Sequence, residues 1–184
     1  AGGACTGLGI PPTKIDRVLG VIEAYTTRVG EGPFPTELLD ADGERLGKVG
    51  HEFGATTGRA RRCGWFDAVV ARYGVHLNGV DALVLTKVDV LDGFNTIKVC
   101  TGYKYKGKIF PDMPADPEVI ANCDPVYVEF DGWSESTLGI QDYDKLPQNA
   151  KNYIDRLSEL VETPFMMIST GPDREQTILR ESLF

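Results

Sequence analysis

The sequence contains little histidine and little cysteine. Two histidines and four scattered cysteines (Cys5, Cys63, Cys100 and Cys123) occur in 184 residues, and none of the cysteines forms a Cys-x-x-Cys pair. This spacing disfavours both a structural zinc site and a disulfide framework. A reducing, cytoplasmic environment is the simplest expectation.

Long hydrophobic runs and excess positive charge are also missing. No apolar run approaches the roughly 20 residues that span a bilayer, so we expect no membrane anchoring. The chain has 19 Lys and Arg against 27 Asp and Glu, a formal net charge of −8. This balance disfavours general nucleic-acid binding, which needs a basic face. The apolar fraction of 42% is ordinary for a soluble globular domain.

The sequence also lacks a phosphate-binding loop of the GxxxxGK[ST] type. The segment from Gly43 to Lys48 has the wrong spacing, and the opening stretch AGGACTGLG carries no lysine. The chain begins without Met and without the pattern of a signal peptide. We therefore expect residues 1–184 to be the C-terminal part of a single larger domain whose N-terminal part carries the phosphate loop.

Buried strands and amphipathic helices are predicted to alternate along the chain. Residues 82–91 and 164–170 are near-continuous apolar runs typical of buried parallel strands. Residues 96–110 alternate like a hairpin, 125–130 predict one more strand, and 14–30 predict a short helix running into a strand. The order of these elements predicts an α/β fold with a mixed sheet, flanking helices and a β-rich insertion.

Two segments have the apolar spacing of helices. One is 65–78, with an expected core stripe at Phe66, Val69, Val70, Tyr73 and Leu77. The other is about 147–162, with a stripe at Leu146, Ala150, Tyr153, Ile154, Leu157 and Val161.

Polar residues follow both buried strands, where open α/β sheets bind ligands. Lys87-Val88-Asp89 follows the first strand, and strand alternation would place Lys87 and Asp89 on one side. A Lys-x-Asp at such a place resembles the guanine-recognition element of GTP-binding proteins, although a solvated ion pair is the simpler alternative. Ser169-Thr170-Gly171 follows the second strand and matches a second guanine-contacting loop, or else an ordinary turn.

The stretch GHEFGATTGRARRCGW concentrates positive charge in an acidic chain. Gly54 and Gly58 allow close backbone approach, and the threonines between them add hydroxyl groups. In an extended loop Arg59 and Arg61 would project to one side and Arg62 to the other. This pattern favours recognition of a carboxylate or phosphate. The alternative is that all three arginines pair with carboxylates of the protein itself.

Five motifs together resemble the adenylosuccinate synthetase family, in the same order and with matching spacing. They are GPFPTEL, GHEFGATTGRARRCGW, LTKVDVLDG, GWSEST and ISTGPDR. The resemblance implies a P-loop NTPase-like fold and the GTP-dependent joining of IMP and L-aspartate into adenylosuccinate, with Mg²⁺ as cofactor, in a homodimer. The general acid/base residues and the phosphate loop would lie outside this chain, which supplies no evident catalytic residue or metal ligand.

The resemblance also implies roles for individual residues. Aspartate would be bound by the loop Ala55, Thr56, Thr57, Gly58, Arg59, Ala60 and Arg61. IMP would contact Val29 and Arg59. GTP would contact Arg61, Lys87, Val88, Asp89, Ser169, Thr170 and Gly171. No chemistry is assigned to GWSEST, and Glu31, Glu37 and Glu52 are interpreted as structural.

Two other functions remain open on the sequence. A GTP-binding regulatory module would explain Lys-x-Asp and Ser-Thr-Gly but would leave the arginine loop without a ligand. A segment inactive by itself is also expected, because the phosphate loop is missing. Such a segment should expose strand edges and apolar surface.

Overall fold

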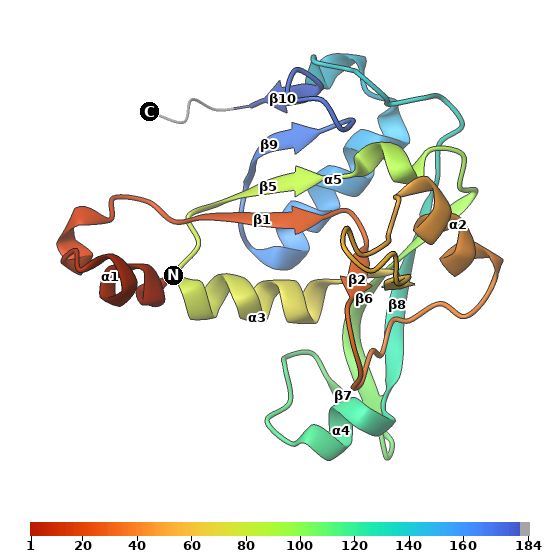
Figure 1. The fold of residues 1–184 in the computed structure, drawn as a ribbon. Coiled ribbons are helices and arrows are strands. Elements are labelled where there is room, and N and C mark those ends of the chain that lie inside the picture. Colours follow the sequence, from red (N-terminus) through yellow and green to blue (C-terminus); the bar gives the residue numbers. More distant parts are fainter. Residues whose placement is uncertain (181–184) are drawn as a thin grey trace.

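The computed structural model of the chain describes residues 1–180 (Figure 1). The α-helices are α1 (Gly2–Leu8), α2 (Ala41–Val49), α3 (Ala68–Asn78), α4 (Pro117–Asn122) and α5 (Gln148–Val161). Short 3₁₀ helices are η1 (Pro12–Lys14), η2 (Val88–Leu91) and η3 (Tyr143–Lys145). The strands are β1 (Leu19–Glu23), β2 (Thr26–Arg28), β3 (Arg62–Gly64), β4 (Phe66–Asp67), β5 (Ala82–Thr86), β6 (Thr96–Tyr105), β7 (Lys108–Phe110), β8 (Asp124–Asp131), β9 (Phe165–Ser169) and β10 (Thr177–Leu179).

The first sheet is mixed and has the order β1-β5-β9-β10. Strands β1, β5 and β9 are parallel, and β10 is antiparallel to β9. Strand β5 is central, which explains its continuous apolar sequence, because parallel strands are covered on both faces. Helix α5 lies behind this sheet in Figure 1, and the Tyr153 hydroxyl donates to the carbonyl of Ala24 at 2.7 Å.

Three strands of the second sheet, β6, β7 and β8, are inserted between β5 and α5, and its fourth strand, β4, precedes α3. Strand β6 pairs antiparallel with β7 and β8 and parallel with β4. Strands β6 and β8 form a long ribbon that extends away from the first sheet, with α4 near its far end (Figure 1). Lys106 and Gly107, both with positive φ, form the tight turn from β6 to β7. The predicted α/β fold, mixed sheet and β-rich insertion are confirmed.

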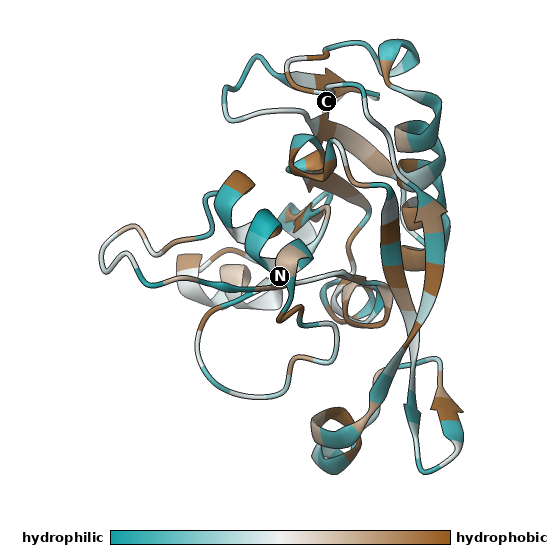
Figure 2. Ribbon diagram, turned by 90° about the vertical axis from the view of Figure 1, so that its right-hand side faces the viewer, coloured by the Kyte–Doolittle hydropathy of each residue, from teal (hydrophilic) through white to brown (hydrophobic). Residues whose placement is uncertain are grey.

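Helix α5 matches the sequence prediction closely. All six residues of its expected stripe, from Leu146 to Val161, are at most 3% exposed. The buried strands predicted around β5 and β9 are confirmed as well, and Figure 2 shows hydrophobic stretches on the strands and mostly hydrophilic loops.

Helix α3 differs from the prediction in two ways. It begins at Ala68 rather than at residue 65, because the Asp67 carboxylate caps it by accepting from the N–H groups of Val69 and Val70. The buried face consists of Ala68, Val69, Ala71 and Val75, whereas Val70, Tyr73 and Leu77 of the expected stripe are 45 to 66% exposed. Helix α3 contacts α5, and Ala68, Ala71 and Val75 of its buried face belong to the main hydrophobic core.

Two further predictions were wrong at strand ends. The strand predicted over 82–91 stops at Thr86, because Lys87 adopts a left-handed conformation (φ 63°) and residues 88–91 form η2. The helix expected near residue 14 is only the 3₁₀ turn η1. The expected apolar edge is present, since Val21 on edge strand β1 is 74% exposed.

Candidate nucleotide and anion site

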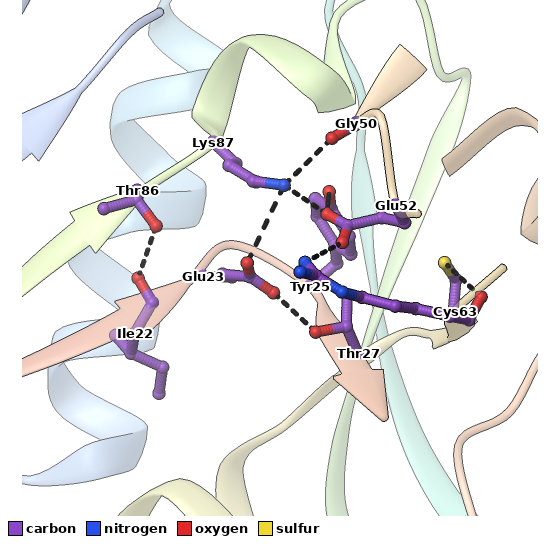
Figure 3. Close-up of polar contacts among 10 residues, drawn as sticks. Ile22, Glu23, Tyr25, Thr27, Gly50, Glu52, Cys63, Thr86 and Lys87 are labelled. Carbon is purple, nitrogen blue, oxygen red and sulfur yellow. Dashed lines mark hydrogen bonds and ion pairs between the residues drawn. The ribbon is translucent and has the colours of Figure 1, made fainter. Parts of the chain in front are cut away.

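The carboxyl ends of three parallel strands place polar side chains at one edge of the first sheet. Strand β1 ends at Glu23, β5 ends immediately before Lys87, and β9 ends at Ser169. Open α/β sheets bind their ligands at this edge. The ends of β1 and β5 and the side chains around them are drawn in Figure 3.

A cavity of about 460 Å³ opens at this edge. Its lining includes Lys87, Asp89, Ser169 and Gly171, which the sequence motifs place in separate segments of the chain. The structure thus brings together four residues of the predicted guanine site. The other two, Val88 and Thr170, are 0% exposed and do not line the cavity.

His51 and Pro172 also line this cavity, and sequence reasoning assigned them no role. Both lie inside motifs quoted above, GHEFGATTGRARRCGW and ISTGPDR, which is the one signal that could have indicated them. His51 has a positive φ of 53°, an unusual backbone conformation for a residue other than glycine.

The Asp89 carboxylate has no hydrogen-bond donor from another described residue. Within residues 1–180, no side chain and no N–H of another residue donates a hydrogen bond to it. Burial raises the pKa of the Asp89 carboxyl, and the neighbouring Asp92 adds to this effect. An external N–H donor would therefore stabilise the ionised form of Asp89.

Lys87 points toward Glu52 and Glu23 (Figure 3). Its ammonium donates to the Gly50 carbonyl at 2.9 Å, forms a short contact with Glu52, and lies 3.7 Å from Glu23. Strand alternation, which predicted Lys87 and Asp89 on one side, does not apply because the strand has already ended.

The Glu52 carboxylate accepts hydrogen bonds from three residues. Its carboxylate is 0% exposed and accepts from Lys87, from the Tyr25 hydroxyl at 2.5 Å and from Arg61 at 2.9 Å. Burial by itself would raise the pKa of Glu52, but the hydrogen bonds from Lys87, Tyr25 and Arg61 outweigh it and lower the pKa. Glu52 is therefore a buried anion with several partners.

The loop from Ala55 to Ala60 is exposed and closed at its base. The Gly54 N–H donates to the Arg59 carbonyl, and the Gly58 N–H donates to the Gly54 carbonyl, both at 2.8 Å. Among the described residues, no acceptor engages the N–H groups of residues 55–57. A closed loop with free N–H groups at its tip suits an anion.

Each of the three arginines contacts a carboxylate of the chain itself. Arg61 binds Glu52, and Arg62 binds Glu37 at 2.5 Å, which lowers the pKa of Glu37. Arg59 lies 3.7 Å from Glu31, and both of these side chains are more than two-thirds exposed. Such a solvated pair contributes little, at most about 1 kcal/mol, so Arg59 is the arginine most easily released to a ligand.

The turn that contains Val29 lies beside the arginine loop. Strand β2 pairs with β3, with Arg28 opposite Arg62, and the Arg62 guanidinium donates to the carbonyls of Gly30 and Gly32. Val29 is 75% exposed at this turn. The predicted IMP contact and the predicted aspartate loop therefore share one surface.

The segment GWSEST (residues 132–137) has a structural role that the sequence did not predict. The Asp92 carboxylate accepts from the Trp133 indole N–H at 2.7 Å, and from the N–H and hydroxyl of Thr137 at 2.7 and 2.8 Å. Ser136 donates to it at 3.2 Å. Because Asp92 directly follows η2, this clamp fixes the turn that carries Asp89.

The described residues 1–180 contain no group of three or more His, Cys, Asp or Glu side chains placed to bind a metal ion, so we assign none of these residues to Mg²⁺. No helix in this part of the chain is long and apolar enough to cross a membrane.

Comparisons with known proteins agree on one family. The family model described as adenylosuccinate synthetase matches residues 1–178. Adenylosuccinate synthetases from Geobacter sulfurreducens and Thermoanaerobacter pseudethanolicus are 55% and 56% identical to this chain over 184 and 179 residues, which are 100% and 97% of it. The fully ligated adenylosuccinate synthetase structure from Plasmodium falciparum superimposes with a TM-score of 0.94 at 40% identity over 98% of this chain.

The chain spans only part of these relatives. It covers 42% of each of the two bacterial proteins and 44% of the Plasmodium chain. Within that span the match is nearly continuous, and it includes every motif discussed above. The chain belongs to the adenylosuccinate synthetase family.

Proposed function

We propose that this chain forms the guanine pocket and the aspartate loop of an enzyme that joins IMP and L-aspartate at the expense of GTP. The observation that carries this proposal is the cavity lined by Lys87, Asp89, Ser169 and Gly171. The family membership supports the reaction, which yields adenylosuccinate, GDP and phosphate.

The Asp89 carboxylate is the proposed reader of guanine. A guanine ring presents two adjacent N–H donors, and two carboxylate oxygens accept such a pair in a bidentate arrangement. The Lys87 ammonium is bound to Gly50 and Glu52, so this residue would contact the base through its methylene stem. Ser169 and Gly171 would complete the pocket, and the buried Val88 and Thr170 would support it from beneath.

The loop Ala55–Arg61 is the proposed aspartate site. Its N–H groups and the Thr56 and Thr57 hydroxyls would receive the aspartate carboxylates, with Arg59 leaving Glu31 to pair with one of them. Arg59 and Val29 would also contact IMP, and Arg61 would lie near the GTP phosphates. The neighbouring positions of the loop and the Val29 turn support a shared site for aspartate and IMP.

The resemblance assigns the chemistry to the bound substrates: the IMP 6-oxygen is phosphorylated, and the aspartate amine then displaces the phosphate. Residues of this chain would bind and orient these groups. Mg²⁺, a second copy of the chain and a cytoplasmic location follow from the resemblance alone and stay predictions.

The guanine assignment is tested in a chimera in which these 184 residues replace the matching segment of the Geobacter sulfurreducens relative. Asp89→Asn should raise the KM for GTP about a hundredfold, because the amide keeps only one neutral acceptor oxygen and turns an NH2 group toward the second guanine N–H; it should favour xanthosine triphosphate, whose 2-oxygen accepts from that NH2 group. Unchanged GTP preference would contradict the guanine role.

The loop assignment uses the same chimera. Arg59→Leu should raise the KM for aspartate at least tenfold and leave that for GTP within about threefold. Arg156→Leu is the matched control, since Arg156 is a half-exposed arginine on α5 whose one ion pair within residues 1–180 is with Glu159. An aspartate KM unchanged by Arg59→Leu would contradict the loop assignment.

A further inference from the structure

Glu52 joins the two proposed substrate sites through a single side chain. Arg61 ends the arginine loop, and Lys87 begins the turn at the guanine cavity, yet both contact the same carboxylate. Figure 3 shows the contact between Lys87 and Glu52. The two cations approach different oxygens, Arg61 contacting Oε2 and Lys87 contacting Oε1.

The backbone of the same segment strengthens this connection. The Lys87 ammonium also donates to the Gly50 carbonyl at 2.9 Å, and the Arg61 N–H donates to the Glu52 carbonyl at 2.8 Å. Residues 50–52 are thus linked to Lys87 on one side and to Arg61 on the other. A shift of either residue is transmitted to the other without passing through solvent.

The burial of Glu52 explains why the connection is stiff. A carboxylate with 0% exposure is not screened by water and needs its cationic partners to remain ionised. Arg61 and Lys87 keep 33% and 30% of their side chains exposed, so each can touch a ligand while it stays bound to Glu52. The surface pair of Arg59 and Glu31 lacks this combination of a buried anion and half-exposed cations.

We propose that Glu52 is a positioning residue that couples the aspartate loop to the guanine cavity by orienting Arg61 and Lys87 from one carboxylate. This inference rests on the proposed function. It assigns Glu52 no contact with substrate. Because Arg61 and Lys87 are oriented by the same carboxylate, the loss of Glu52 weakens the binding of aspartate and of GTP together.

The test uses the chimera described above with Glu52→Gln, which keeps the size of the side chain and removes its charge. The KM values for aspartate and for GTP should each rise about tenfold, while kcat at saturation of all substrates stays within about twofold. A purely structural role would instead lower kcat in proportion to the folded fraction and leave both KM values unchanged.

Two further variants keep the test decisive. Glu52→Asp retains the charge and therefore serves as the test if Glu52→Gln fails to fold. Its shorter side chain cannot reach both cations, so both KM values should rise at least threefold. Tyr25→Phe is the matched control, because it removes a hydrogen bond from the same carboxylate and leaves both cations in place. It should leave both KM values within twofold.

The outcomes separate this inference from the proposed function. A chimera with the unchanged sequence that joins IMP and aspartate, but in which the Glu52 variants alter one or neither KM, contradicts the coupling alone. A chimera with the unchanged sequence that is folded and inactive contradicts the proposed function and the coupling with it.

Discussion

Removal of the Asp92 carboxylate should strongly destabilise the chain. In Asp92→Ala, the Trp133 indole N–H and the N–H and hydroxyl of Thr137 lose their acceptor. Trp133 is 3% exposed and Thr137 is 0% exposed, so water cannot readily replace the carboxylate. The bond from Ser136 is longer and exposed, and its loss contributes little.

The magnitude follows from the number of buried donors. A hydrogen bond to a charged acceptor contributes about 1.5 to 3 kcal/mol, and the three buried donors together give a loss of about 4 kcal/mol after partial relaxation. For a chain of this length, that loss lowers Tm by about 8 to 16 °C. Asp92→Asn keeps one acceptor oxygen and should lose about half as much.

Urea unfolding of the 184-residue chain, followed by tryptophan fluorescence, measures the free energy of unfolding. Asp131→Ala is the control, because Asp131 is exposed at the end of β8 and its side chain makes no hydrogen bond within residues 1–180. It should change the free energy of unfolding by less than about 0.5 kcal/mol. A loss below about 1 kcal/mol in Asp92→Ala would show that the clamp is not a stabilising network.

Three other perturbations have defined outcomes. Burial raises the pKa of the Asp67 carboxyl in the folded state, so ionisation of this group disfavours folding. The stability of Asp67→Asn relative to the unchanged chain should therefore increase as pH rises from below 3.8 to neutrality. A difference between the two urea midpoints that does not change with pH would contradict this. Gly132→Ala places a Cβ 1.7 Å from the Phe94 carbonyl oxygen and should lower the free energy of unfolding in urea by more than about 2 kcal/mol. Gly74→Ala, which has open space around it in α3, should raise that free energy by up to about 1 kcal/mol. Equal effects of the two substitutions would refute the packing argument. Val21→Lys charges the exposed apolar edge strand and should reduce self-association measured by light scattering, which an unchanged scattering intensity would contradict.

The candidate site divides into a part that local sequence predicts and a part that it does not. The motifs containing Lys87, Asp89 and Ser169 follow recognisable buried strands, and parallel strands bring their carboxyl ends to one edge. The partners of the arginines could not be predicted in this way. Glu31, Glu37 and Glu52 were all interpreted as structural, and nothing local distinguishes the buried Glu52 from the exposed Glu31.

Helix α3 shows the same division. Its apolar content predicts a helix, and the sequence offers two apolar stripes, one of large residues and one containing Ala68 and Ala71. The large stripe was the natural choice for a core. The structure buries the small one in the core, which is a property of packing rather than of periodicity.

The sequence by itself determined the strands β5 and β9, the helix α5 and the positions of the polar motifs, because these follow from patterns within about 15 residues of chain. Only the tertiary structure decided that Glu52 joins Arg61 to Lys87 and that Asp92 is clamped by GWSEST. Those contacts join residues up to 45 positions apart. Burial and the course of the sheet determine which residues meet, and neither can be predicted from a local sequence pattern.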